Sequence, residues 1–167
     1  MDMKKNILLA IIFCAFSNTI LKAQLGQSMP VSHAHWKFST KKINECEYDL
    51  VFNLALDKGW HTFSIQKIKG IGLEVFPTQI IFYPNSNYSL IGNLTETKPV
   101  PEYDKTIEKT VLLHYNQVTF TQRIKLKSGN SVKIIGKYEY QVCNEVCQQP
   151  PYEEFSFELK GTLSCKK

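Results

Sequence analysis

Two cysteines close together in the sequence, Cys143 and Cys147, are the residues of this chain best suited to chemistry. They flank Asn144-Glu145-Val146, where a turn would bring their Cα atoms within the about 7 Å that a disulfide spans. In the loop-entropy description of disulfides, such a short ring stabilises a fold by only about 2 kcal/mol. The disulfide would therefore add little to the stability of the fold. It is better suited to reversible reduction, because it can open and close on one short loop.

The only charge between these cysteines is that of Glu145. Its negative charge raises the pKa of a neighbouring thiol by like-charge repulsion, and no cation lies there to stabilise a thiolate. This pattern predicts a protected dithiol that reacts when a partner protein docks. The sequence leaves open which of the two sulfurs attacks first.

The first 23 residues have the pattern of a secretory signal peptide. Lys4 and Lys5 precede an apolar run over residues 7–16, and the segment ends at Ala23. The run is too short for the about 20 residues that cross a bilayer. We expect cleavage after Ala23, no stable membrane insertion afterwards, and a periplasmic protein, with secretion as the alternative.

Two further cysteines, Cys46 and Cys165, would remain in the exported chain, and an oxidising compartment permits disulfides. The ring that they could close would stabilise the fold by about 5 kcal/mol in the loop-entropy description. Cys165 lies in a segment, 162–167, that we expect to be a loose tail, so the sequence leaves this pairing open.

A metal centre is the rival use of paired cysteines. Zinc would need two further ligands, and a copper site of the cupredoxin type would need a histidine soon after a cysteine. No histidine follows His114. His33 and His35 could hold a metal at the surface, although such pairs near a terminus usually bind none. His61 and His114 lie in strand-like stretches and are interpreted as packed or surface histidines. We expect no metal and no cofactor.

Alternating apolar residues predict β-strands through most of the chain after the signal segment. The clearest runs cover residues 50–56, 118–127, 132–142 and 155–159, with shorter ones at 79–83 and 88–91. The turn residues Ser128-Gly129-Asn130 predict that the runs 118–127 and 132–142 form a hairpin. Pro99, Pro101 and several charges predict an exposed loop over 94–106.

Roughly seven to nine short strands joined by turns predict an all-β protein, an antiparallel β-sandwich. We expect this domain over residues 34–161, after a flexible leader at 24–33 and before the tail. The net charge of the sequence is +5, too mild an excess to predict nucleic-acid binding.

The order and spacing of several stretches resemble the N-terminal periplasmic domain of DsbD, the thiol:disulfide interchange protein (protein-disulfide reductase). The stretches are Trp36, then Asp57-Lys58-Gly59-Trp60-His61, then Gly136 to Cys143, and finally Cys147 with Pro150-Pro151. The likeness covers roughly residues 34–160. It implies an immunoglobulin-like sandwich in which Cys143 and Cys147 accept electrons from a thioredoxin-like domain and pass them to exported oxidoreductases.

The family also shields its disulfide with a cap loop that carries an aromatic residue. The matching region here is Glu102-Tyr103-Asp104, which makes Tyr103 the cap candidate. The spacing between Cys143 and Cys147 is shorter than in the best-known members. Full-length DsbD continues into a membrane domain and a thioredoxin-like domain, and this sequence holds neither. We therefore expect thioredoxin-like or DsbD-type redox partners in trans.

Two functions remain open on the sequence alone. The first is an exported thiol–disulfide interchange module, a component of a protein-disulfide reductase system, in which Cys143 and Cys147 form mixed disulfides with partner proteins. The alternative is a non-catalytic immunoglobulin-like binding or adhesion module whose Cys143–Cys147 disulfide is inert and structural.

Overall fold

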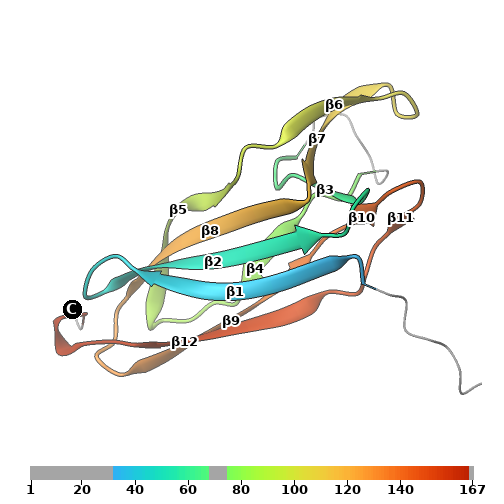
Figure 1. Cartoon of the computed structure of the whole chain (residues 1–167). Coiled ribbons are helices and arrows are strands. Elements are labelled where there is room, and N and C mark those ends of the chain that lie inside the picture. The colour runs from blue at the N-terminus through green and yellow to red at the C-terminus, as the bar shows by residue number, and fades with distance from the viewer. Residues whose placement is uncertain (1–31, 68–74, 166–167) are drawn as a thin grey trace, which may run out of the picture. The chain divides into compact units, whose positions relative to one another are not determined.

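The computed structural model describes residues 32–67 and 75–165, which form an antiparallel β-sandwich (Figure 1). The expected signal segment and most of the leader lie outside the described residues. The strands, followed by one 3₁₀ turn, are β1 (Ala34–Lys42), β2 (Glu47–Leu56), β3 (His61–Phe63), β4 (Gln79–Phe82), β5 (Tyr88–Glu96), β6 (Val100–Asp104), β7 (Lys109–Tyr115), β8 (Gln117–Leu126), β9 (Ser131–Glu139), β10 (Val142–Cys143), β11 (Cys147–Gln148), β12 (Glu153–Lys160) and η2 (Leu163–Cys165).

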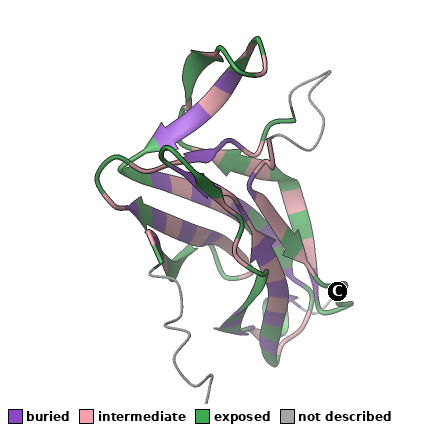
Figure 2. Ribbon diagram, turned by 90° about the vertical axis from the view of Figure 1, so that its right-hand side faces the viewer, coloured by how far each residue is buried: buried purple, intermediate pink, exposed green. Residues whose placement is uncertain are grey.

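The strands form three sheets, in the orders β1-β2-β8-β5, β12-β9-β4 and β11-β10-β3-β7-β6. The first two enclose the main core. Phe52 of β2, which is completely buried, packs edge-on against Phe155 and Phe157 of β12 at ring-centroid distances of 4.9 and 5.4 Å. Figure 2 shows buried residues alternating with intermediate or exposed ones along strands of the sandwich, as a strand with one face on a core requires. The predicted all-β, immunoglobulin-like sandwich is confirmed. In the part of the chain that the structure describes, no helix has the length and apolar character needed to cross a membrane.

The predicted hairpin between residues 118–127 and 132–142 is wrong. β8 pairs with β2 and β5 in one sheet, whereas β9 pairs with β12 and β4 in the other. Phe120 and Ile134, one from each strand, are both fully buried. The short turn between the strands therefore carries the chain across the core, and the two apolar faces meet instead of lying side by side. Alternation predicts which face of a strand is buried, but it does not identify the neighbouring strand.

The predicted exposed loop over residues 94–106 is also corrected. β5 continues to Glu96, and β6 pairs with β7 as an antiparallel hairpin. Pro101 is accommodated because β6 is the edge strand of its sheet, so a missing N–H on the outer side costs no hydrogen bond of the ladder. The β6–β7 hairpin forms one wall of a surface groove that also contains His61.

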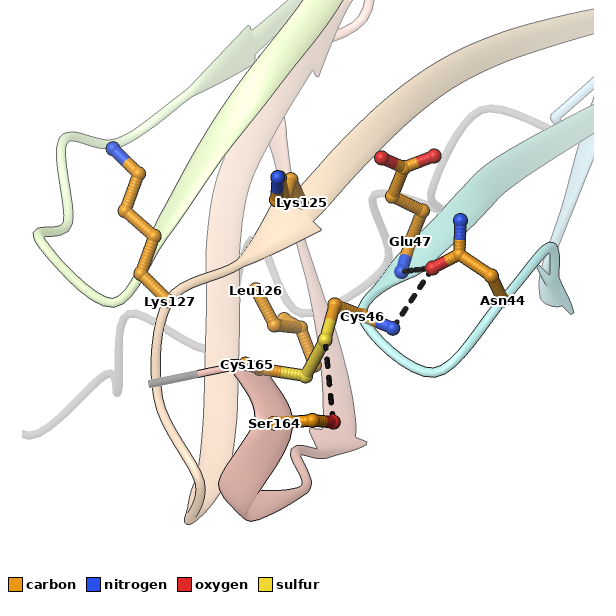
Figure 3. Close-up of a pocket in the computed structure, with 8 residues that line it drawn as sticks. All are labelled: Asn44, Cys46, Glu47, Lys125, Leu126, Lys127, Ser164 and Cys165. Carbon is orange, nitrogen blue, oxygen red and sulfur yellow. Dashed lines mark hydrogen bonds between the residues drawn. A yellow bond between two sulfur atoms is a disulfide. The ribbon is translucent and has the colours of Figure 1, made fainter. Parts of the chain in front are cut away.

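The second pair of cysteines ties the end of the described chain to the β1–β2 turn. Cys46 and Cys165 form a disulfide with a Cα–Cα distance of 5.4 Å. Cys165 lies in η2 and is buried, so the described part of the expected tail is fixed to the domain instead of loose. The disulfide lines a surface pocket of about 480 Å³ (Figure 3), on the side of the sandwich away from β10 and β11 (Figure 1).

Candidate redox site

The Cys143–Cys147 disulfide closes a minimal hairpin at one edge of the β11-β10-β3-β7-β6 sheet. The two cysteines face each other across β10 and β11, with their Cα atoms 4.1 Å apart. In the turn between them, the Val146 amide donates a hydrogen bond to the Asn144 side-chain oxygen at 3.0 Å. β11 contributes only two paired residues, so this hairpin is peripheral to the main sandwich. The sequence correctly placed this pair at a turn and within disulfide distance.

The two sulfur-bearing residues differ sharply in exposure. Cys143 is only 1% exposed and belongs to a small apolar cluster with Phe63, Val111 and Leu113. Cys147 is exposed. A molecule that approaches from solution therefore meets Cys147, while Cys143 is reached only through the disulfide itself.

A row of side chains extends from the disulfide across the sheet. Cys143 lies opposite His61 of β3, and His61 lies opposite Tyr115 of β7. Residues directly opposite each other in antiparallel strands point to the same face. Cys147, Cys143, His61 and Tyr115 therefore share one face of this sheet. The hydroxyl of Tyr115 donates a hydrogen bond to Glu102 of β6 at 2.6 Å.

A groove of about 240 Å³ lies on this face, beside the cluster that holds Cys143. The residues lining it are His61, Phe63, Glu102, Tyr103, Asp104, Lys105, Val111 and Leu113. Tyr103 is 60% exposed. The structure thus brings Tyr103, proposed from the family resemblance, to the groove that also contains His61.

Burial and nearby carboxylates set the charge state of this face. Burial lowers the pKa of His61, and the negative charges of Glu102 and Asp104 partly oppose that shift. The imidazole is therefore neutral near pH 7. Burial and the hydrogen bond to Glu102 together raise the pKa of Tyr115 to about 12, so its phenol stays protonated.

The opposite face of the same sheet carries a buried carboxylate–histidine pair that the sequence did not reveal. The Glu96 carboxylate lies 2.9 Å from His114 Nε2, and both side chains are at most 5% exposed. Ser64 Oγ, the Ile65 amide and Gln66 also donate hydrogen bonds to this carboxylate. Burial raises the pKa of Glu96, but these hydrogen bonds together outweigh burial and leave the pKa below its ordinary value. The network ties the segment after β3 to β5 and β7. Glu96 was missed because it lies in the stretch expected to be a loop.

The histidines considered as a surface metal site are engaged with a carboxylate. His33 and His35 each lie 2.9 Å from a different oxygen of Asp57, and the His33 ring stacks on Trp60 at 3.8 Å. Among the described residues, no group of three or more His, Cys, Asp or Glu side chains is arranged to hold a metal ion.

The structure therefore defines an immunoglobulin-like sandwich with a short-range disulfide at the edge of one sheet. Residues 26–159 match the family model of the N-terminal domain of the thiol:disulfide interchange protein DsbD, and the chain belongs to that family. This confirms the resemblance seen in the sequence. No curated protein sequence matches the chain significantly.

Two solved structures illustrate the similarity. The N-terminal periplasmic domain of ScsB from Proteus mirabilis superposes with a TM-score of 0.52 at 17% identity, over 80% of this chain and 49% of that one. The chain thus spans about half the length of that protein's domain. The DsbD N-terminal domain of Neisseria meningitidis, in the reduced form, gives a TM-score of 0.44 at 13% identity, over 75% of this chain and 85% of that one.

Proposed function

We propose that this protein is a thiol–disulfide interchange module in which Cys143 and Cys147 are the redox pair. The observation that carries the proposal is the asymmetry of the disulfide, with an exposed Cys147 and a Cys143 that is only 1% exposed. Its position on a peripheral hairpin adds support, because opening the bond leaves the pairing of the main sandwich unchanged. Membership of the DsbD N-terminal family agrees with this role.

The exposed sulfur is where exchange begins. When the module accepts electrons, a partner thiolate attacks Cys147 Sγ, the Cys143–Cys147 bond breaks, and Cys143 leaves as a thiolate that takes up a proton. A second thiol of the partner then attacks the mixed disulfide and loses its proton, which releases reduced Cys147 and an oxidised partner. When the module donates electrons, the same steps run in reverse. Two electrons and two protons are transferred in either direction.

The partners that fit this chemistry are thioredoxin-like or DsbD-type proteins, which would dock in trans. Exposed Val146 lies in the turn between the cysteines and is 68% exposed. Tyr103 and Tyr152, at 60% and 58% exposure, are further exposed side chains with apolar surface. Val146, the residue before Cys147, gives a docking partner apolar contact area beside that sulfur.

We further propose that residues 1–23 direct export and are removed, which leaves a periplasmic protein with its sandwich domain at residues 34–161. The family match begins at residue 26, just after the expected cleavage site. The mass of the exported protein tests this proposal, because cleavage after Ala23 predicts a chain that begins at Gln24.

Tyr103 is proposed to cap the disulfide against small reductants. The support is its place on the groove beside the cluster that holds Cys143. In a Tyr103→Ala variant, reduction of the disulfide by dithiothreitol should become several-fold faster, while Tyr152→Ala, a change to another exposed tyrosine, should leave the rate unchanged. Equal rates in wild type and Tyr103→Ala would contradict the cap.

The decisive experiment measures the reduction potential of the pair. The mature protein is equilibrated with glutathione or thioredoxin buffers, and its free thiols are trapped and counted. A potential near −200 to −270 mV supports interchange, whereas one below about −300 mV identifies an inert structural bond and favours the binding-module alternative. In addition, Cys147 of a Cys143→Ser protein should form a stable mixed disulfide with a thioredoxin that keeps a single active-site cysteine, activated as its disulfide with thionitrobenzoate. Thionitrobenzoate is then the leaving group, and no second thiol is present to reverse the exchange. Cys147→Ser is the matched control and should trap little, since its remaining thiol is buried.

A further inference from the structure

Breaking the Cys143–Cys147 bond raises a problem of charge. Cys143 is buried with Phe63, Val111 and Leu113, and an apolar environment disfavours a thiolate. Yet Cys143 must leave as a thiolate when Cys147 is attacked, and must become one again when it resolves a mixed disulfide. A group able to exchange a proton with Cys143 would relieve this cost in both directions.

His61 is placed to be that group. It is the direct cross-strand partner of Cys143 on β3, and opposite residues of this kind have Cβ atoms about 4.5–5.5 Å apart on the same face. The ring is half-buried and packs edge-on against Phe63 at 5.8 Å, so it is held beside the same cluster as Cys143. A neutral imidazole can accept a proton, and an imidazolium can return one.

The other titratable groups around His61 are less suited to this exchange. Tyr115 lies opposite His61 on β7. Burial and a hydrogen bond that its hydroxyl donates to Glu102 raise its pKa to about 12, so it does not exchange a proton near neutral pH. Asp104 and Lys105 lie on the far wall of the groove, on the β6–β7 hairpin. Glu102 and Asp104 are instead placed to stabilise a positive charge on His61.

We propose that His61 is the proton-exchange partner of Cys143, taking the proton of the Cys143 thiol when that sulfur attacks and returning it when Cys143 is expelled as a leaving group. The transfer moves one proton between Sγ and the imidazole, and the electrons follow the disulfide exchange described above. This inference rests on the proposed interchange function. From the sequence, His61 was interpreted as a packed or surface histidine. Its nearness to Cys143 is not visible there, because it arises only from the pairing of β3 with β10.

The first test isolates the pair from any redox step. In Cys147→Ser protein, with Cys46 and Cys165 kept as a disulfide, Cys143 is the only free thiol in the chain after signal cleavage. Its ionisation is followed by thiolate absorbance near 240 nm. Adding His61→Gln should lower the thiolate fraction several-fold in the pH range where the imidazole can hold the proton that the thiol gives up. At higher pH, where His61 is neutral before the thiol ionises, the two titration curves should converge. Adding His35→Gln instead, at an exposed histidine, is the control and should leave the titration unchanged. An unchanged titration in the His61→Gln protein would overturn the proposal.

The second test keeps both cysteines and measures the pH profile of disulfide reduction by dithiothreitol. The ratio of wild-type to His61→Gln rate constants removes the titration of dithiothreitol itself. We expect a ratio of about ten at pH values where His61 is protonated, falling toward one as the pH rises and the leaving group is no longer assisted. A ratio that does not change with pH would show that His61 acts only through packing and would sink the proposal. A reduction potential of the Cys143–Cys147 pair below about −300 mV would instead rule out the interchange function. The titration of Cys143 would still test the role of His61, so the two failures can be told apart.

Discussion

The two disulfides should differ strongly in what they contribute to the free energy of unfolding. This difference distinguishes a structural disulfide, Cys46–Cys165, from a redox-active one, Cys143–Cys147. The perturbation is to replace each pair by alanine, in Cys46→Ala/Cys165→Ala and Cys143→Ala/Cys147→Ala proteins. The comparison is well matched, because one member of each pair is buried, Cys165 at 5% and Cys143 at 1% exposure. Costs of truncating a buried sulfur therefore largely cancel between the two variants.

The magnitudes follow from the lengths of the two rings. The sequence separations are 119 residues for Cys46–Cys165 and 4 residues for Cys143–Cys147. Because the entropy of loop closure grows with the logarithm of ring size, removing the long ring should cost about 5 kcal/mol and removing the short one about 2 kcal/mol. Single domains are stable by only about 5–15 kcal/mol, so the first loss threatens the fold and the second does not.

Urea unfolding followed by tryptophan fluorescence measures both losses. With a slope of about 2 kcal/mol per molar urea, the midpoint should fall by about 2.5 M without Cys46–Cys165 and by about 1 M without Cys143–Cys147. Dithiothreitol-treated wild type should approach the behaviour of a protein lacking both bonds. An equal or larger loss in the Cys143→Ala/Cys147→Ala protein would refute the view that this hairpin can open while the sandwich stays folded.

Two further predictions concern packing and buried charge. A Cβ at residue 136 would overlap the Ile81 carbonyl oxygen and the Phe155 ring, so Gly136→Ala should lower the unfolding free energy by about 2–3 kcal/mol in a urea titration; wild-type stability would contradict this packing. Glu96→Gln should lower the unfolding free energy by about 1–3 kcal/mol at pH 7, because it removes a buried carboxylate that pairs with His114 and accepts hydrogen bonds from Ser64 and Ile65. The depressed pKa of Glu96 stabilises the fold above the unfolded value of about 4.3, and this contribution is lost as the pH falls through the lower folded pKa. The stability gap between wild type and Glu96→Gln should therefore shrink in acid, and a constant gap would be inconsistent with hydrogen bonds that stabilise the ionised Glu96 carboxylate.

Much of the fold could be predicted from local pattern. The alternation of β2, with Leu50, Phe52 and Leu54 buried, and that of β12 were apparent in the sequence because strand periodicity is a property of neighbouring residues. The hairpin predicted for β8 and β9 failed because the same alternation serves strands within one sheet and strands that face each other across a core. The strand β6 was missed because Pro101 is compatible with an edge position that only the sheet order reveals.

The candidate site likewise combines features that the sequence predicts with features that only the tertiary structure reveals. Cys143 and Cys147 are close in the sequence, so their spacing alone indicated a short-range disulfide and its switch-like character. Their unequal exposure depends on the packing of Cys143 against β3 and β7, which no local pattern encodes. The Cys46–Cys165 bond likewise depends on η2 folding back onto the β1–β2 turn.

By itself, the sequence determined an all-β chain, the register of its apolar faces and a cysteine pair at a turn, because each of these rests on residues a few positions apart. The tertiary structure decided which strands are neighbours. That choice set His61 beside Cys143, placed Tyr103 on the groove and buried Glu96 against His114. Such contacts join residues far apart along the chain, and they exist only once the sheets have formed and excluded water from the space between them.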